Sequence, residues 1–96
     1  MSNFNLTMQE MKILSALSTQ EMYGYQILKE IKSKILLGSL YNSLKTMERK
    51  GFVESYWGDE AGQGGRRKYY RITALGDEVF ENTKNELIPL FGLKLI

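Results

Sequence analysis

The sequence predicts an α+β fold that is mostly α, a winged helix-turn-helix with three helices, a two-stranded wing and a C-terminal helix. Three observations lead to this prediction. Residues 39–50 carry apolar side chains at helical spacing. Residues 52–57 and 66–73 are rich in β-branched and aromatic side chains, and a glycine-rich segment separates them. Helical patterns flank these elements on both sides, so the two strands form a hairpin between helices.

The composition restricts both the size of the fold and its chemistry. The chain has 96 residues, enough for one small core, and contains neither cysteine nor histidine. Without cysteine, disulfides and thiolate metal sites are excluded. Without histidine, the chain lacks the commonest general base and the commonest zinc ligand. No pair of carboxylates stands among apolar neighbours. We therefore expect no enzyme activity, no metal and no cofactor.

The sequence shows no sign of membrane insertion or secretion. No stretch approaches the roughly 20 apolar residues that span a bilayer. The first residues have neither the basic region nor the long apolar core of a secretory signal. We therefore expect a protein that contacts no membrane and works in the cytoplasm.

The first two helices are predicted from local signals. Thr7 and Glu10 have the spacing of a capping box, in which each side chain binds the backbone of the other residue, and this helix should end near Ser18. A second helix is predicted from Glu21 onwards. Glycine disfavours a helix by up to about 1 kcal/mol relative to alanine. We therefore expect another backbone to pass close to Gly24.

Residues 39–50 are predicted to form the central helix of the fold, with one apolar face and one polar face. Leu40, Leu44 and Met47 form its apolar face, and Gly51 follows where a left-handed residue would end a helix. The opposite face carries short polar side chains and cations: Ser39, Asn42, Ser43, Lys45, Thr46 and Arg49. Such residues can pair with base edges in a major groove or bind phosphates. All six are therefore candidate DNA-binding residues.

The segment before this helix is apolar. Ile35, Leu36 and Leu37 are consecutive, and no serine, threonine or aspartate stands where it would cap the helix. We expect this aliphatic run to pack beneath the wing.

Four further DNA-binding candidates lie outside the central helix. Arg66, Arg67 and Lys68 are consecutive and open the returning strand, which predicts a wing with a cationic, glycine-rich tip. Tyr25 points away from the apolar stripe of the second helix. Either its hydroxyl reaches a phosphate oxygen or it lies on the surface without a ligand. The glycines of the tip lead into a strand, whereas a nucleotide-binding loop opens a helix, so they do not support a nucleotide site.

The net charge is only +2, but the charges are unevenly distributed. Residues 29–50 hold six cations and two acids, a balance of +4, and residues 66–71 add four cations and no acid. Residues 77–86 hold four acids and one cation, a balance of −3. Positive charge thus gathers on the central helix and the returning strand, as on a surface that binds phosphates. The alternative is ordinary solvated surface charge.

The C-terminal segment has a different character. A fourth helix is predicted from its cap, Thr73, and Pro89 is expected to end or kink it. We divide the chain into a winged helix-turn-helix domain, residues 1–72, and a C-terminal helix with an apolar tail, residues 73–96. Such a tail needs a partner surface, so it either pairs with a second copy or folds back onto its own domain. The predicted dimerisation residues are Leu87, Ile88, Leu90 and Phe91, and the facing surface would hold Met8, Ile13 and Met22.

Four short motifs follow one another along the chain. They are Tyr23-Gly24-Tyr25, then Gly38-Ser39-Leu40-Tyr41 with Leu44, then Lys50-Gly51-Phe52-Val53, and then Gly64-Gly65-Arg66-Arg67-Lys68-Tyr69-Tyr70-Arg71-Ile72-Thr73. Together they resemble the PadR family of bacterial transcriptional regulators, over residues 10–80. The run Ser55-Tyr56-Trp57-Gly58-Asp59-Glu60 also resembles the members that regulate multidrug transporters.

The resemblance implies a homodimeric winged-helix repressor that binds double-stranded DNA at a palindromic operator and is released by a small effector. In such proteins the helix matching residues 39–50 enters the major groove, the wing lies along the backbone, and the tyrosine matching Tyr25 approaches a phosphate. Members that sense drugs can hold a flat aromatic ligand between protomers, so Trp57 either faces such a cavity or packs against the core. The alternative function is a winged-helix module without DNA binding that docks a protein partner through its apolar tail.

Overall fold

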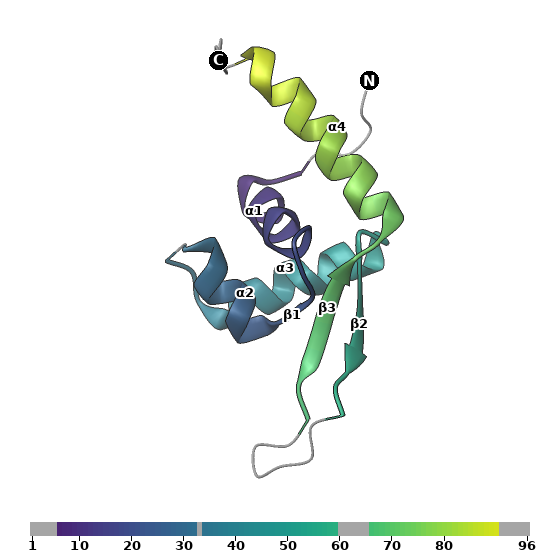
Figure 1. Cartoon of the computed structure of the whole chain (residues 1–96). Helices are drawn as coiled ribbons and strands as arrows, with labels where there is room; N and C mark the ends of the chain where they lie inside the picture. Colours follow the sequence, from purple (N-terminus) through teal and green to yellow (C-terminus); the bar gives the residue numbers. More distant parts are fainter. Residues whose placement is uncertain (1–5, 33, 60–65, 91–96) are drawn as a thin grey trace.

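The computed structural model describes residues 6–32, 34–59 and 66–90, except the side chains of residues 89 and 90. Along the chain the elements are α1 (Met8–Leu17), β1 (Met22–Tyr23), α2 (Gly24–Ile31), α3 (Leu37–Arg49), β2 (Val53–Trp57), β3 (Lys68–Ile72) and α4 (Ala74–Leu90). Figure 1 shows α1, α2 and α3 packed as one helical body, with β2 and β3 extending from it as a wing. The predicted winged helix-turn-helix, mostly α with a C-terminal helix, is confirmed.

The sheet has three strands rather than the two expected from the sequence. The strand order is β1-β3-β2, and β1 and β2 both run antiparallel to β3. Met22 lies opposite Tyr70, and Tyr23 lies opposite Tyr69. The sequence pattern assigns the two β1 residues to the second helix, which instead begins at Gly24. A strand of two residues is too short to show an alternating pattern, so only its pairing with β3 identifies it.

Threonine caps fix the starts of α1 and α4. The backbone N–H of Glu10 donates to Thr7 Oγ1 at 3.0 Å, and the N–H of Thr7 donates to Glu10 Oε1 at 2.9 Å, which confirms the predicted capping box. The C-cap of α1 is Ser18, as expected. At α4 the N–H of Gly76 donates to Thr73 Oγ1 at 2.9 Å, so the Thr73 cap is also confirmed.

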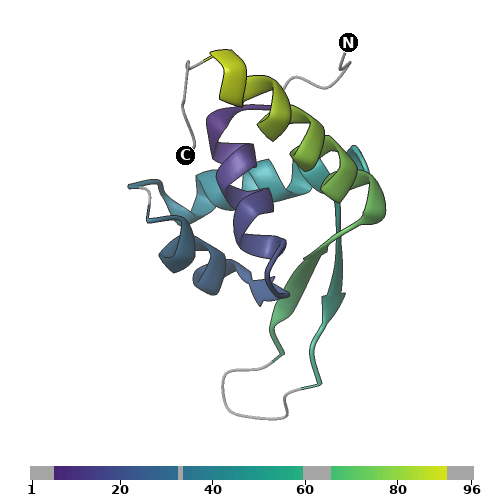
Figure 2. The same cartoon turned by 45° about the horizontal axis from the view of Figure 1, so that its top comes forward.

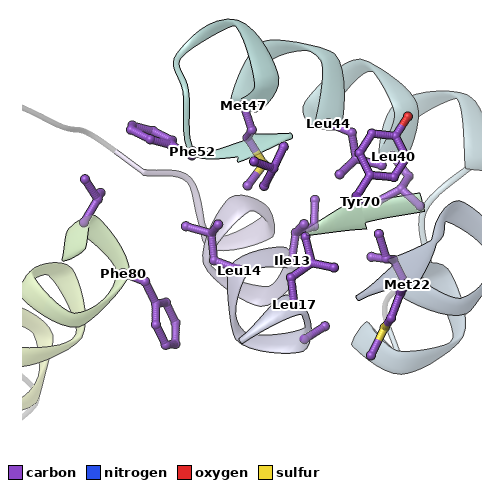
Figure 3. Close-up of a cluster of buried hydrophobic side chains, with 14 residues drawn as sticks. Ile13, Leu14, Leu17, Met22, Leu40, Leu44, Met47, Phe52, Tyr70 and Phe80 are labelled. Carbon is purple, nitrogen blue, oxygen red and sulfur yellow. The ribbon is translucent and has the colours of Figure 1, made fainter. Parts of the chain in front are cut away.

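The core lies between α1, α3, the inner face of the sheet and the first half of α4. Figure 3 shows the α1 side chains at its centre, with those of α3 on one side and Phe80 of α4 on the other. The buried apolar residues are Ile13, Leu14, Ala16, Leu17, Met22, Ile27, Leu40, Leu44, Met47, Phe52, Val53, Tyr70, Val79 and Phe80. Ile13 and Met22 therefore belong to the core of their own chain, and the prediction that they face a second copy is wrong.

A backbone contact holds α4 against the start of β2. Gly76 packs so closely on Phe52 that an added Cβ would come 2.0 Å from the Phe52 carbonyl oxygen. The same oxygen accepts the N–H of Thr73 at 3.0 Å. From there α4 crosses α1, and its last turns extend beyond the other helices (Figures 1 and 2). The helix continues to Leu90, so Pro89 lies in its last turn and does not end it. A kink at Pro89, the other expected effect, stays a prediction.

The turn between α2 and α3 departs from the prediction. Ile35 packs against the core, but Leu36 and Leu37 are exposed and do not lie beneath the wing. Leu36 is the N-cap of α3 and has an extended backbone, with φ −73° and ψ 148°. Neighbouring side chains of an extended chain point in opposite directions, so Ile35 and Leu36 cannot both face the core.

Candidate nucleic-acid interface

The outer face of α3 carries four of the predicted residues. The exposed ones are Ser39, Asn42, Lys45 and Arg49. The apolar side chains of the opposite face are fully buried, which fixes the rotation of the helix and holds the polar face outward. Asn42, Lys45 and Arg49 follow one another at spacings of three and four residues, so they form one row, which we call the α3 stripe. Asn can pair with adenine, and the two cations with guanine or phosphate.

Ser43 and Thr46 lie at the side of the α3 stripe, and both are half-buried. Gln9 of α1 donates a hydrogen bond from Nε2 to Ser43 Oγ at 2.6 Å. The structure therefore turns Ser43 towards α1 rather than outward with Asn42. Helical spacing alone places Ser43 and Asn42 on one polar face. The hydrogen bond of Ser43 cannot be predicted from that spacing, because Gln9 lies 34 positions away in the sequence and is brought close only by the packing of α1 on α3.

Tyr25 lies in the first turn of α2, and its side chain is 55% exposed. The ammonium group of Lys29 lies 5.7 Å from the centre of its ring, a cation–π contact one turn along the helix. An exposed hydroxyl beside a cation is suited to a phosphate oxygen. The contact of Tyr25 with phosphate stays a prediction.

Arg66 and Arg67 lie where the chain enters β3, and both are exposed. Arg66 Nε donates to the Gly58 carbonyl oxygen at 2.9 Å, and the Gly58 N–H donates to the Arg67 carbonyl oxygen at 2.7 Å. These two bonds tie the end of one wing strand to the start of the other and hold both arginines at that level. Residues 60–65, which hold most of the predicted glycine-rich tip, lie outside the described residues.

A cavity of about 460 Å³ lies between α3 and the wing, and we call it the wing cavity. The residues that line it are Tyr23, Tyr41, Trp57, Arg66, Arg67, Lys68 and Tyr70. The ammonium group of Lys68 lies 5.8 Å from the ring centre of Trp57 and 6.0 Å from that of Tyr70. Trp57 is 57% exposed, so it borders this cavity instead of packing in the core. The cavity combines aromatic rings with three cations and joins α3 to the wing in one surface.

The outer face of the sheet carries a row of tyrosines that come from three separate motifs of the sequence. The rings of Tyr23 and Tyr69 meet edge to face at 5.6 Å, and Tyr56 stacks on Tyr69 at 5.7 Å. The Tyr56 hydroxyl is hydrogen-bonded to the Glu21 carboxylate, and this bond raises the pKa of the tyrosine. Alternation within the two wing strands could have placed Tyr56 and Tyr69 on one face, but the third ring requires the pairing of β1.

Arg71, the fourth cation of the returning strand, is paired with acids. Its Nε lies 2.5 Å from Glu54 Oε1, and one terminal nitrogen lies 3.9 Å from Glu21 Oε2. The hydrogen bond to Glu54 raises the pKa of the guanidinium group further. The positive charge that this strand presents to a partner is therefore concentrated at Arg66, Arg67 and Lys68.

The same described ranges offer neither a metal-binding cluster nor a membrane-spanning helix. No group of three acidic side chains is placed there to hold a metal ion. No helix in this part of the chain has the length and apolar character needed to cross a membrane.

Burial raises the pKa of the Tyr70 phenol above its ordinary value, and the neighbouring Tyr41 and Glu48 add to the effect. The phenol therefore keeps its proton to a higher pH than a free tyrosine does.

Comparison with known proteins places this architecture in a family. The sequence profile of the transcriptional regulator PadR-like family matches residues 13–82, which include α1 from Ile13, the wing and the first half of α4. The chain belongs to this family. The PadR resemblance of its sequence motifs is thereby confirmed.

PadR-like proteins of known structure share the fold. A PadR family transcription regulator from Clostridium difficile R20291 is 35% identical, with a TM-score of 0.75, and the match covers 88% of this chain and 98% of that one. Bacillus subtilis PadR, solved in complex with operator DNA, is 21% identical, with a TM-score of 0.72 over 81% of this chain and 47% of that one, a likeness of fold. An uncharacterised protein of Lysinibacillus sphaericus is 40% identical over 70 residues. That match covers 67% of this chain and 63% of the relative. This chain therefore matches less than two thirds of the relative's length.

Proposed function

We propose that this PadR-like chain is a transcriptional regulator that reads a specific DNA sequence through α3 and holds the DNA backbone through its wing. The observation that carries the proposal is the exposed α3 stripe together with the wing cavity, which is lined by Tyr41 of the same helix and by the wing cations Arg66, Arg67 and Lys68. Its cations match phosphates, and Asn42 has the donor and acceptor pair that adenine requires. Bacillus subtilis PadR, which has the same fold, was solved with operator DNA.

The predicted residues take three roles in this proposal. Asn42 reads base edges, together with Ser39 and Thr46 beside it. A second group binds phosphates and is made up of Tyr25, Lys45, Arg49, Arg66, Arg67 and Lys68. Ser43 acts through its hydrogen bond with Gln9, which positions α3 against α1.

The first experiment selects bound duplexes from a random library and then measures the affinity of the best sequence. Asn42→Ala should weaken binding to the selected duplex by about 1–3 kcal/mol and change binding to random DNA much less. Lys84→Ala, on α4, is the control and should bind like the wild type. Equal losses of Asn42→Ala on both duplexes would show that Asn42 touches only the backbone. Failure to select any sequence would refute the proposed function.

We further propose that the regulator is a cytoplasmic repressor that binds a palindromic operator as a dimer. Two copies related by a twofold axis present two α3 helices to successive major grooves, so they read inverted half-sites. The support on this chain is apolar surface on and near α4. Leu87 and Ile88 are only half-buried, and Met8 is 59% exposed. Leu90 and Phe91 complete the predicted dimer segment, although their side chains lie outside the described residues.

We also propose a small aromatic effector that binds in the wing cavity. The four aromatic rings suit a flat molecule, and three cations favour a negatively charged one over a planar cationic dye. A ligand there would lie between the two elements assigned to DNA and release it. Trp57, the only tryptophan of the chain, reports binding by its fluorescence. Flat aromatic anions that neither quench Trp57 nor displace the selected duplex would refute the effector.

The second candidate function is a winged-helix module that docks a protein partner without binding DNA. The observation that favours it is the half-buried apolar pair Leu87 and Ile88 on the projecting end of α4. The selection experiment separates the two functions, because such a module would enrich no duplex sequence.

A further inference from the structure

Two exposed leucines stand at the N-terminus of α3, and the roles assigned above do not use them. Leu36 is 78% exposed and Leu37 is 40% exposed, although the preceding Ile35 packs against the core. Leu36 is more exposed than any other large hydrophobic residue in the part of the chain that the structure describes. Removing such side chains from water is favourable, so a partner that buries this pair would gain binding free energy.

The position of Leu36 disfavours a leucine on local grounds. It is the N-cap of α3 and makes no side-chain hydrogen bond to the helix. Serine, threonine, aspartate and asparagine are preferred at N-caps because their oxygens accept a free backbone N–H. The same chain uses Thr7 and Thr73 in this way at α1 and α4. The N-cap of α2, Tyr23, also makes no side-chain bond to its helix, but its ring packs on Tyr69 of the same chain. Leu36 differs because it lacks a capping oxygen and is also 78% exposed, which indicates a contact made outside the chain.

The surroundings of the pair indicate a polyanion as the occupant. Lys34 stands two residues before Leu36 and is exposed, and Lys45 and Arg49 add positive charge two and three turns further along the same helix. In a helix-turn-helix the N-terminal residues of the second helix contact base edges in the major groove. The apolar group that a base pair displays in this groove is the 5-methyl group of thymine.

We propose that Leu36 and Leu37 contact thymine methyl groups in the major groove and so add a thymine preference to the sequence that Asn42 reads. The proposal rests on the DNA-binding function proposed above. Contact with one methyl group corresponds to a change of about fourfold in the dissociation constant. The two leucines act as specificity-determining residues that make no hydrogen bond to the DNA.

The test uses the selected duplex with deoxyuridine in place of one thymine at a time. Deoxyuridine lacks the methyl group but keeps the pairing and the hydrogen-bonding edge of thymine. Fluorescence anisotropy gives the affinity of the full chain as wild type, Leu36→Ala, Leu37→Ala and Leu36→Met, which keeps an apolar side chain. Leu75→Ala is the matched control, since Leu75 is 39% exposed and lies on α4.

We expect the wild type, Leu36→Met and Leu75→Ala to lose about fourfold in affinity at one or more thymines. Leu36→Ala or Leu37→Ala should already bind the thymine duplex about fourfold more weakly than the wild type. The affinity of that variant should then not change when deoxyuridine replaces the thymine that the leucine contacts. The side chains are exposed, so thermal unfolding should show all variants folded.

Three results would overturn the inference and leave the proposed function intact. The first is a wild type that binds every deoxyuridine duplex like the parent. The second is a response of the alanine variants to deoxyuridine as strong as that of the wild type, which would assign the methyl contact to another residue. The third is a change in the mass of the protein in solution on substitution, which would make the pair a contact with a second copy. Absence of any specific duplex would refute the proposed function itself, and this inference with it.

Discussion

The phenol ring of Tyr41 on α3 lies directly against Gly24 at the start of α2, so that a Cβ at residue 24 would come 2.5 Å from the Tyr41 hydroxyl oxygen. The sequence led us to expect a backbone beside this glycine, but the neighbour is an aromatic side chain. Tyr41 also lines the wing cavity and is 42% exposed. Gly24 therefore makes room for a ring of the proposed interface.

Gly24→Ala should disturb the wing cavity more than the fold. The added methyl meets the outer end of the Tyr41 side chain, which can swing towards solvent, and alanine favours the helix by up to about 1 kcal/mol. We expect the free energy of unfolding to change by less than about 1 kcal/mol, while the Trp57 emission changes because Tyr41 leaves the cavity. Denaturant unfolding followed by Trp57 fluorescence measures both.

The matched control is Gly38→Ala, because a Cβ at residue 38 has nothing within 4 Å. This variant should leave the Trp57 emission unchanged and keep or slightly raise the stability. A loss of several kcal/mol in Gly24→Ala would show that the Tyr41 ring cannot move aside.

Gly76→Ala should behave in the opposite way. Here the added Cβ would lie 2.0 Å from a backbone oxygen, that of Phe52, which cannot rotate away. Overpacking of this kind costs about 1–3 kcal/mol or more, which exceeds the gain of about 1 kcal/mol in helix propensity. We expect a lower midpoint of urea unfolding than in Gly38→Ala. Equal midpoints would mean that α4 can shift away from Phe52 at little cost.

The wing arginines should set part of the salt dependence of DNA binding. Each phosphate contact that is lost lowers the slope of log K against log salt concentration by about 0.9. Arg66 and Arg67 are exposed, whereas Lys68 is half-buried against two aromatic rings. Replacing both arginines by alanine should therefore lower the slope by the amount that corresponds to about two phosphate contacts. Lys68→Ala should lower the slope by less than one of the arginine replacements does.

Anisotropy titrations at several salt concentrations give these slopes. Lys84→Ala is the control, since Lys84 lies on α4 and pairs with Glu81 at 3.1 Å. An unchanged slope in the double arginine variant would remove the wing from the interface.

The parts of the fold that were predicted correctly depend on local chemistry. The capping box of Thr7 and Glu10 needs only three residues of spacing, and Gly51, with a φ of +84°, occupies the left-handed conformation that its sequence position suggested. The apolar face of α3 follows from helical periodicity, and Leu40 and Met47 are fully buried.

The parts that the sequence did not reveal depend on contacts between distant segments. β1 exists only because Met22 and Tyr23 pair with β3, 46 or more residues later. The orientation of Ser43 depends on Gln9 of another helix. The wing cavity requires α3 and both wing strands to be placed in space, so no single motif predicts it.

Tyr70 should make the stability of the fold fall in alkaline solution. Burial raises the pKa of its phenol above the value of 10.0 that it has in the unfolded chain. Below about pH 10 the phenol is protonated in both the folded and the unfolded chain, so the contribution of Tyr70 to the free energy of unfolding is complete. Above about pH 10 the unfolded chain loses the proton first, so stability falls as the pH rises towards the folded pKa. Tyr70→Phe has no phenol to ionise and should lose less stability between about pH 9 and pH 11. Tyr25→Phe, at an exposed position, is the control and should follow the wild type in thermal unfolding.

The last prediction is that the chain forms a twofold dimer through its C-terminal segment. One recognition helix gives too small an interface for the dissociation constants of about 10⁻⁸ M that are typical of specific regulators. A twofold axis would place two α3 helices roughly 34–36 Å apart, on one side of a palindrome. The last turns of α4 extend beyond the other helices, and Leu87 and Ile88 there are only half-buried (Figure 1).

Light scattering on the intact chain and on a chain that stops after Asn85 tests this dimer. We expect the intact chain to have twice the mass of one copy, and the shortened chain to be monomeric and to bind the selected palindrome at least tenfold more weakly, a loss of about 1.4 kcal/mol. If the tail instead folds back onto its own domain, both chains are monomers. An intact monomer that still binds the palindrome tightly would rule out the dimer, because one copy would then supply the whole interface.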